Sequence, residues 1–377
     1  MTVLVVLLLV WCAGTALLLV PNARVLRALW QEPVLTRPVV ILESDDWGPG
    51  PASDAMMLKR IAHRLAAIRD PEGRPAVMTL GLVLGRPDGE AILAEQCHAY
   101  HRSTLDEARY APQRHGLEHC WPDSLLAQAR GTEALRDWLA DPDARSEALP
   151  SALQSRWANT ATLPSQPLPM DAIEAAVKEE GDAFQHIFGE RPTVAVPNTF
   201  VWTEAVERAW AADGVRCVVT CGRQFEGRGA DGALLPPTKL LFNGGRGAAG
   251  VRYVVRDVYF EPIRGHRAEQ VWQAVAERVA LGRPALIETH RESFIASPDG
   301  AEQALAELVR AMHGILQRHA DICFVSTGVL ADALSARGNP LLAGDALTRL
   351  VTFLRRLLAS PPLSRALKLS GLRIVLL

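Results

Sequence analysis

Cysteine is scarce in this sequence, and neither sign of charge is in excess. The chain has 377 residues and six scattered cysteines: Cys12, Cys97, Cys120, Cys217, Cys221 and Cys323. This spacing indicates buried free thiols, because it supports neither a disulfide framework nor a four-cysteine zinc knuckle. The formal net charge is −2, and no basic run is interleaved with aromatic residues. We therefore expect no nucleic-acid partner.

Charge is absent from the amino-terminal segment Thr2 to Val20. About 19 residues rising ~1.5 Å each nearly cross the ~30 Å hydrocarbon layer of a membrane. No Lys or Arg precedes this run and no small-residue cleavage pattern follows it, so we predict an uncleaved transmembrane anchor over residues 1–23 rather than a signal peptide. Arg24, Arg27 and Arg37 follow the span, which slightly favours the cytoplasmic side for the rest of a single-pass, membrane-anchored protein.

Acidic residues are absent from Ala346 to Leu377. Six cationic residues alternate there with leucine and valine at helical spacing: Arg349, Arg355, Arg356, Arg365, Lys368 and Arg373. This pattern predicts a basic amphipathic helix over residues 345–377 that lies on anionic membrane lipid. The alternative is an ordinary terminal helix packed on the domain.

Between the two ends, residues 36–335 alternate apolar strand-like runs with amphipathic helical stretches, which is typical of an α/β barrel or a doubly wound sheet. We predict strands at Val39–Glu43, Val77–Leu84, Val194–Pro197, Val215–Thr220, Val251–Phe260, Ala285–His290 and Ile322–Ser326. The clearest helices are expected at Met170–Phe188, Thr203–Asp213, His266–Leu281 and Pro298–His319. The polar segments Gly85–Arg114 and Asp141–Pro169 are expected to be insertions over the mouth of the scaffold.

The first strand leads directly into two adjacent carboxylates, Asp45 and Asp46. Active sites of α/β proteins are built at the carboxyl ends of their strands. Neighbouring strand residues point in opposite directions, so one carboxylate could bind a cation while the other accepts a proton. A turn-capping aspartate pair is the alternative.

Two histidines four residues apart, His115 and His119, form the second motif. Within His115-Gly116-Leu117-Glu118-His119 they can bind one ion. One interpretation is a facial site in which Asp46 is the third ligand. The other is an inverted zinc-peptidase signature, in which Glu118 is the base and Glu179 or Glu180 a ligand. Gly116 and the nearby Pro122 weaken the long helix that the peptidase signature requires.

A third polar cluster ends the predicted strand Ala285–His290. His290 would face the same mouth as the aspartates and could protonate a leaving group, with Arg291 beside it. A carboxylate from Asp257 or Glu261 could orient His290. Asn198 and Trp202, after another strand, could form the wall of a sugar pocket, although the aromatic rings could equally belong to the core.

These segments together resemble the polysaccharide deacetylase superfamily. The resemblance covers Val39 to about Leu334 and is carried by Ser-Asp-Asp-Trp-Gly at 44–48, Leu-Gly-Arg-Pro-Asp at 84–88, His-Gly-Leu-Glu-His at 115–119 and Thr-His-Arg at 289–291. It implies a distorted, incomplete (β/α) barrel and the removal of acetyl groups from amino sugars.

The resemblance also implies residue roles and a cofactor. Asp45 matches the family's catalytic base and His290 its general acid, while Asp46, His115 and His119 match its ligands for a divalent metal, with Zn²⁺ the first choice. Asn198, Trp202 and Arg291 are our candidates for substrate contact. A metal would polarise the acyl carbonyl and hold the attacking water.

Two departures from the family pattern are visible. Gly116 stands where the family usually has Ser or Thr, and Ala195-Val196-Pro197-Asn198 lacks the Arg that normally tunes the catalytic base. Arg256 or Arg291 could substitute for it. Asp257 is the only candidate we find for the aspartate of a further family motif.

We therefore predict a metal-dependent hydrolase that removes an acyl group, with N-acetyl as first choice, from a glycan or lipid-linked sugar. One alternative is a membrane-tethered glycan-binding or assembly protein on a degenerate barrel. Another is a zinc peptidase that uses Glu118.

Overall fold

A parallel sheet forms the centre of the molecule. The computed structural model describes residues 2–48, 51–85, 110–336 and 338–376. Within them, a nine-stranded sheet has the path β8-β5-β4-β3-β2-β1-β10-β9, with β11 paired to the start of β1, and every pairing is parallel. The strands are β1 (Val39–Trp47), β2 (Met78–Leu82), β3 (Tyr110–Arg114), β4 (Val194–Ala195), β5 (Cys217–Thr220), β8 (Arg252–Val255), β9 (Val258–Tyr259), β10 (Ala285–His290) and β11 (Cys323–Phe324).

The sheet curls into an incomplete barrel. Its two edge strands, β8 and β9, are separated in the chain only by Arg256 and Asp257. Three steps of the chain join Val255 to Val258 and span at most about 11 Å, so the opposite edges of the sheet must lie close together. No ladder pairs β8 with β9 among the described strands, so the barrel remains open there. This topology confirms the predicted fold class, a distorted, incomplete (β/α) barrel.

Alternation along β1 determines what lies inside the barrel. Val40 and Leu42 pack in an outer cluster, whereas Val39 and Ile41 join an inner cluster with residues from β4, β5, β8 and β10. The same inner face continues to Glu43 and then Asp45. Their β10 partners in register are Glu288 and His290, so the lumen changes from apolar to charged toward the carboxyl ends of the strands.

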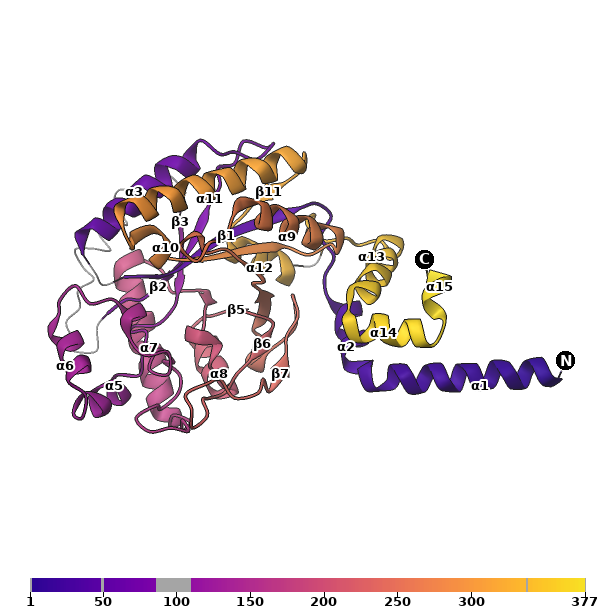
Figure 1. The fold of residues 1–377 in the computed structure, drawn as a ribbon, viewed down its shortest axis with the longest axis horizontal. Helices are drawn as coiled ribbons and strands as arrows, with labels where there is room; N and C mark the ends of the chain where they lie inside the picture. Colours follow the sequence, from indigo (N-terminus) through magenta and orange to yellow (C-terminus); the bar gives the residue numbers. More distant parts are fainter. Residues whose placement is uncertain (1, 49–50, 86–109, 337, 377) are drawn as a thin grey trace.

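Helices cover the outside of the sheet (Figure 1). Long amphipathic helices pack where the sequence predicted them, because their apolar stripes recur at helical spacing. The first of these, α7, closes at Gly189, whose φ of 80° is left-handed. The helices of the domain are α3 (Ala52–Ala66), α5 (Pro122–Ala129), α6 (Glu133–Ala140), α7 (Met170–Phe188), α8 (Glu204–Ala212), α9 (Ala268–Ala280), α10 (Glu292–Ile295), α11 (Pro298–Arg318) and α12 (Thr327–Ser335).

Two sequence predictions are corrected by the sheet. Tyr110–Arg114, expected at the end of an insertion, is the strand β3 between β2 and β4. Its proline, glutamine and arginine hid it, because the prediction looked for apolar runs. The expected strand Val251–Phe260 is two strands at opposite edges, since the chain crosses from one edge to the other at Arg256-Asp257. Residues 86–109, with Cys97 and most of the Leu84–Asp88 motif, lie outside the described residues.

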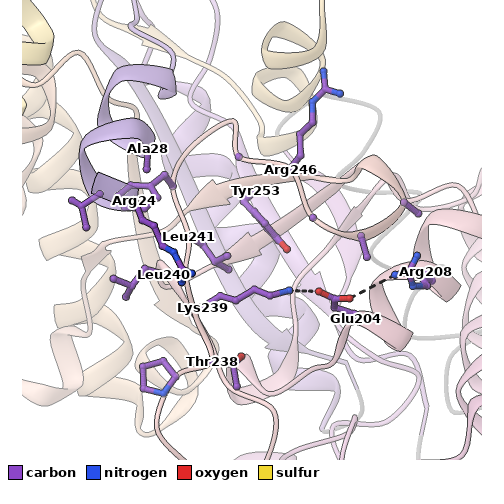
Figure 2. A pocket seen from close by; sticks show the side chains of 17 residues that line it. Arg24, Ala28, Glu204, Arg208, Thr238, Lys239, Leu240, Leu241, Arg246 and Tyr253 are labelled. Atoms are coloured by element: carbon purple, nitrogen blue, oxygen red, sulfur yellow. Dashed lines mark hydrogen bonds and ion pairs between the residues drawn. The ribbon is translucent and has the colours of Figure 1, made fainter. Parts of the chain in front are cut away.

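A two-stranded sheet, β6 (Arg223–Gln224) with β7 (Lys239–Leu240), lies beside a wide cavity that also borders α2 and α8 (Figure 2). The amino-terminal helices are α1 (Thr2–Leu19) and α2 (Ala23–Gln31), joined by one 3₁₀ turn. In Figure 1, α1 projects away from the barrel. One helical segment, Leu9–Gln31, with a mean hydropathy of 1.5, is long and apolar enough to cross a membrane; a signal sequence would meet the same criteria.

The carboxyl-terminal region is three short helices rather than the single helix predicted: α13 (Ala346–Ala359), α14 (Pro361–Leu369) and α15 (Leu372–Leu376). They pack beside α1 and α2 (Figure 1). The indole Nε1 of Trp11 donates to the carbonyl of Ser370 at 2.8 Å. Arg356, expected on a lipid-facing surface, is buried instead. Its guanidinium group donates to backbone carbonyls of α2 and of the loop before β10, at Leu29, Glu32, Pro33, Leu281 and Gly282.

Arg356 should therefore hold the terminal helices to the barrel. Arg356→Ala should destabilise the folded state by about 3–5 kcal/mol, because it leaves Glu32 and several carbonyls buried with fewer partners. Thermal unfolding of the detergent-solubilised chain would measure the loss. The matched control is Arg355→Ala, whose side chain is exposed. Equal unfolding temperatures for the two variants would contradict the role given to Arg356.

Candidate metal centre and active site

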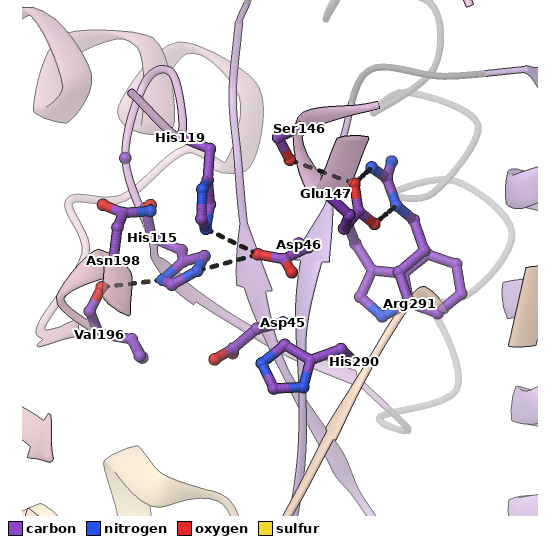
Figure 3. A network of polar contacts seen from close by, with 12 residues as sticks. Asp45, Asp46, His115, His119, Ser146, Glu147, Val196, Asn198, His290 and Arg291 are labelled. Atoms are coloured by element: carbon purple, nitrogen blue, oxygen red, sulfur yellow. Dashed lines mark hydrogen bonds and ion pairs between the residues drawn. The ribbon is translucent and has the colours of Figure 1, made fainter. Parts of the chain in front are cut away.

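A local irregularity at the end of β1 places the two aspartates. The register of β1 against β2 slips between Ser44 and Trp47, and Asp46 has a φ of 68°. A bulge re-aims side chains, and a left-handed non-glycine residue stores strain of order 1–3 kcal/mol that surrounding contacts must offset. Asp45 and Asp46 consequently face different partners within the same site (Figure 3).

The paired histidines lie on a tight loop after β3. No helix is formed at residues 115–119. The loop turns at Gly116, whose φ is 115° and where a Cβ would lie 2.5 Å from the Glu118 carbonyl oxygen. Glycine at this position is thus required by the backbone. Two side chains anchor the loop: Asn198 Nδ2 donates to the carbonyl of His115 at 2.6 Å, and the amide of Gly116 donates to Glu180 Oε1 at 2.8 Å.

Asp46, His115 and His119 converge on one point, and all three are buried. Asp46 Oδ1 lies 3.2 Å from His115 Nε2 and 3.0 Å from His119 Nε2. Two ligands held ~2.1 Å from one ion at angles of 90–109° lie about 3.0–3.4 Å apart. Two imidazole nitrogens and one carboxylate oxygen form a donor set suited to Zn²⁺, Fe²⁺ or Co²⁺. The residues therefore fit a divalent metal.

The hydrogen bond on the far side of the His115 ring supports this fit. His115 Nδ1 lies 2.9 Å from the carbonyl oxygen of Val196, an acceptor, so Nδ1 must carry the proton. The Nε2 lone pair of neutral His115 then faces Asp46 Oδ1, which also carries lone pairs. Such a pairing requires a cation or an extra proton between the two atoms. A backbone carbonyl that fixes the tautomer is the usual outer partner of a metal-binding histidine.

Asp45 is bound to a buried cation rather than to the histidines. Arg256 NH1 lies 2.6 Å from Asp45 Oδ2, and both side chains are almost completely buried. Burial pushes the pKa of Asp45 upward, but the guanidinium of Arg256, with smaller effects of His115 and His290, brings it below its usual value. The other oxygen, Oδ1, is buried and has no hydrogen-bond partner among the described residues. Its capacity to accept a hydrogen bond is therefore unused within the described residues.

Gly81 on β2 makes room for Asp45. A Cβ at this position would lie 2.2 Å from Asp45 Oδ1. Any larger residue would therefore push the carboxylate out of its place. The sequence contained no signal for this requirement, since Gly81 is one glycine inside an apolar run.

His290 is held by a carboxylate from the preceding strand region. Its Nδ1 lies 2.5 Å from Glu261 Oε1. Burial alone would lower the pKa of His290, but the hydrogen bond to Glu261, together with the charges of Asp46, Glu261 and Asp45, raises it to about 10. Of the two orienting carboxylates predicted from sequence, the structure brings Glu261 to His290, whereas Asp257 pairs with Arg278 at 2.6 Å.

Two of the three predicted substrate contacts are placed elsewhere, and the third is already bound to a carboxylate. Trp202 is fully buried in the core with its Nε1 donating to Glu207 at 2.8 Å, so it cannot form the wall of a pocket. Asn198 is also fully buried and supports the His115 loop. Arg291 lies near the site, but its guanidinium group is bound to Glu147 at 2.9 and 2.6 Å, and only 1% of its side chain is exposed. Arg256, rather than Arg291, is the arginine that pairs with Asp45.

The peptidase interpretation fails on geometry. Residues 115–119 are not helical. Glu118 forms an ion pair with the buried Arg156, and Glu180 accepts from the backbone of Gly116 instead of joining the histidines. Neither carboxylate belongs to the cluster of ligand atoms around Asp46.

A narrow cavity of about 20 Å³ opens beside Asp46 and His119, with room for about one water molecule. Ser146, Leu149 and Arg291 also line it. The predicted insertion Asp141–Pro169 therefore does reach over the mouth of the barrel. Figure 3 shows Glu147 clamped by Arg291 above the aspartates. No sequence signal marked Glu147, because its partner lies 144 residues away.

No family model matches this chain, and no curated protein sequence matches it. Among solved structures it is similar to a family 4 acetyl xylan esterase from Clostridium thermocellum in complex with cobalt (15% identity, 80% of this chain and 94% of that chain, TM-score 0.40). It is also similar to a family 4 carbohydrate esterase from Streptomyces lividans in complex with acetate (12%, 77% and 92%, 0.37). A third is 4-alpha-glucanotransferase from Thermococcus litoralis (9%, 78% and 40%, 0.42). The first two belong to the family that the sequence motifs resemble, and their activities are not transferred to this chain.

The converging ligands predict that the purified chain binds one Zn²⁺ or Co²⁺ ion. Asp46→Ala, His115→Ala and His119→Ala should each weaken binding at least about a hundredfold, since the loss of an outer partner alone costs 10–100-fold. Titration of metal-stripped protein with Co²⁺, followed by its visible absorption, would measure this.

Asp45→Asn and the exposed His63→Ala are matched controls that should retain the ion. If the wild type bound Co²⁺ no more tightly than the three ligand variants do, the metal centre would be contradicted.

Proposed function

We propose that this chain is a metal-dependent hydrolase that removes an acyl group, with N-acetyl as first choice, from the amide of a glycan or lipid-linked sugar. The observation that carries the proposal is the placement of Asp45 and His290 beside the Asp46–His115–His119 cluster. Asp45 and His290 are partners in register on adjacent strands. A proton acceptor and a proton donor thus flank one metal-binding point, as acyl transfer to water requires.

The side chains would divide the reaction between them. A bound divalent ion supplies a polarised carbonyl and a more acidic water. Asp45, kept ionised by Arg256, accepts the proton of that water at its unpartnered Oδ1. His290, kept protonated by Glu261, donates a proton to the departing amine. The buried position of these groups strengthens each charge interaction by excluding water.

A membrane-linked substrate would fit the rest of the chain. The apolar segment Leu9–Gln31 is long enough to span a bilayer, and the terminal helices expose Leu347, Leu369 and Ile374. A lipid-linked sugar would bring its head to a barrel anchored in the same membrane. The positive-inside tendency of Arg24, Arg27 and Arg37 favours the cytoplasmic face.

Asp45→Asn should reduce acetate release from N-acetylglucosamine oligomers by about 10²–10⁴-fold, because the amide cannot accept the proton. The metal should remain bound at one ion per chain. Acetate release and metal content measured on the same sample separate the two effects. If the wild type and Asp45→Asn both release no acetate, the degenerate glycan-binding alternative is favoured. If both release acetate at the same rate, a residue other than Asp45 is the base.

The peptidase alternative is tested by Glu118→Gln. This substitution should leave acetate release within about tenfold of wild type, since Glu118, although it lines the small cavity, is paired with Arg156 and is not one of the clustered ligands. The peptidase assignment would replace the deacylase assignment if Glu118→Gln abolished cleavage of an unstructured peptide while Asp45→Asn left that cleavage intact.

The pH profile should depend on Glu261. Because Glu261 raises the pKa of His290, His290 stays protonated, and active as an acid, up to high pH. Glu261→Gln removes this effect, so the pKa of His290 falls toward its usual value near 6.5. The loss of activity at alkaline pH should therefore begin at a lower pH than in the wild type. The control is Glu292→Gln, which pairs with Arg264 on the surface. Identical alkaline limbs in wild type and Glu261→Gln would refute the general-acid role.

A further inference from the structure

A wide cavity lies outside the barrel, away from the metal cluster. Its volume is about 960 Å³, within the range of small-ligand sites. It is enclosed by α2, α8, β7 and the loop that leads into β8 (Figure 2). None of its lining residues also lines the small cavity at Asp46. A ligand here would therefore not be the reacting substrate.

The charged residues of this cavity are mostly cations. Arg24, Arg208, Lys239 and Arg246 line it, against one carboxylate, Glu204. Lys239 pairs with Glu204, and Arg208 lies 3.6 Å from the same carboxylate. Within the described part of the chain, no hydrogen bond or ion pair engages the side chain of Arg24. Figure 2 shows Arg24 extending from α2 toward Lys239 and Leu240. The cavity consequently holds unneutralised positive charge.

Apolar groups form the rest of the wall. Val25 and Ala28 of α2 line the cavity together with Leu240, Leu241 and Phe242. Leu240 is 59% exposed, so its side chain is accessible to a ligand in the cavity. A ligand that contacts both the cationic and the apolar residues of the cavity must contain an anionic group joined to an apolar group.

The cavity also adjoins the apolar amino-terminal helix. Arg24 is the second residue of α2, and α2 follows α1 after a single 3₁₀ turn. The charged cavity thus lies just beyond the end of α1, which is the level of lipid phosphates if α1 alone, and not the whole segment Leu9–Gln31, lies in the membrane.

We propose that this cavity binds the phosphate headgroup of an anionic phospholipid, with its acyl chains continuing along α1. Arg24 contacts the phosphate, Arg208, on the far side of the Lys239–Glu204 pair, adds positive charge to the same cavity, and Leu240 contacts the glycerol and upper acyl region. The bound lipid fixes how the barrel sits on the membrane. The proposal is independent of the hydrolase activity, since the two sites share no residue.

The test uses the full chain in a nonionic detergent, titrated with dioctanoyl phosphatidylglycerol and followed by native mass spectrometry. One saturable lipid should bind. Arg24→Gln and Arg208→Gln should each weaken binding about fivefold, and the double variant about 25-fold, as expected for about 1 kcal/mol per arginine. Retention of the Co²⁺ site in each variant shows that the fold is intact.

Three comparisons can overturn the proposal. Arg27→Gln removes an exposed arginine of the same helix that does not line the cavity, and should change binding less than twofold; an equal loss would mean diffuse attraction only. Dioctanoyl phosphatidylcholine should bind at least tenfold more weakly, and equal binding would mean an apolar contact only. Inorganic phosphate should not displace the lipid at equal concentration; displacement would identify a free-anion site.

Discussion

The guanidinium group of Arg256 is buried in the barrel lumen, where it faces three carboxylates. Asp45 lies 2.6 Å away, Glu288 3.2 Å and Glu43 3.5 Å. Burying one cation and three acids is costly unless they neutralise one another. Burial raises the pKa of Glu43 to about 7 despite Arg256, and that of Glu288 also rises. Arg256 therefore keeps Asp45 ionised while its other two neighbours hold their protons more strongly.

Arg256 has this position because of the chain path. It is one of the two residues that lead from β8 at one edge of the sheet to β9 at the other. Its side chain enters the lumen at the gap where the barrel is incomplete. The gap, the buried cation and the ionised Asp45 are thus parts of one arrangement, and a fully paired sheet would leave no such crossing. The segment around Pro197 has no arginine to pair with Asp45, and the fold brings Arg256 to it from the connection between β8 and β9.

The site depends on small irregularities in otherwise regular elements. The bulge at Asp46 separates the partners of two adjacent aspartates. The absence of a Cβ at Gly81 leaves space for Asp45, and the left-handed Gly116 turns the histidine loop. The outer contacts of Asn198 and Val196 then fix the orientation of His115. Each feature costs backbone freedom or strain, and the well-packed layers on both sides of the sheet offset that cost.

The sequence by itself determined the alternating α/β pattern, the strand ends that carry Asp45, Asp46 and His290, and the four-residue spacing of His115 and His119. These are local properties, because apolar periodicity and motif spacing are read within a few residues. Only the tertiary structure decided that Glu261 orients His290, that Arg256 pairs with Asp45 and that Trp202 belongs to the core. Such pairings join residues far apart in the sequence, and closure of the barrel, which no local pattern encodes, brings them together.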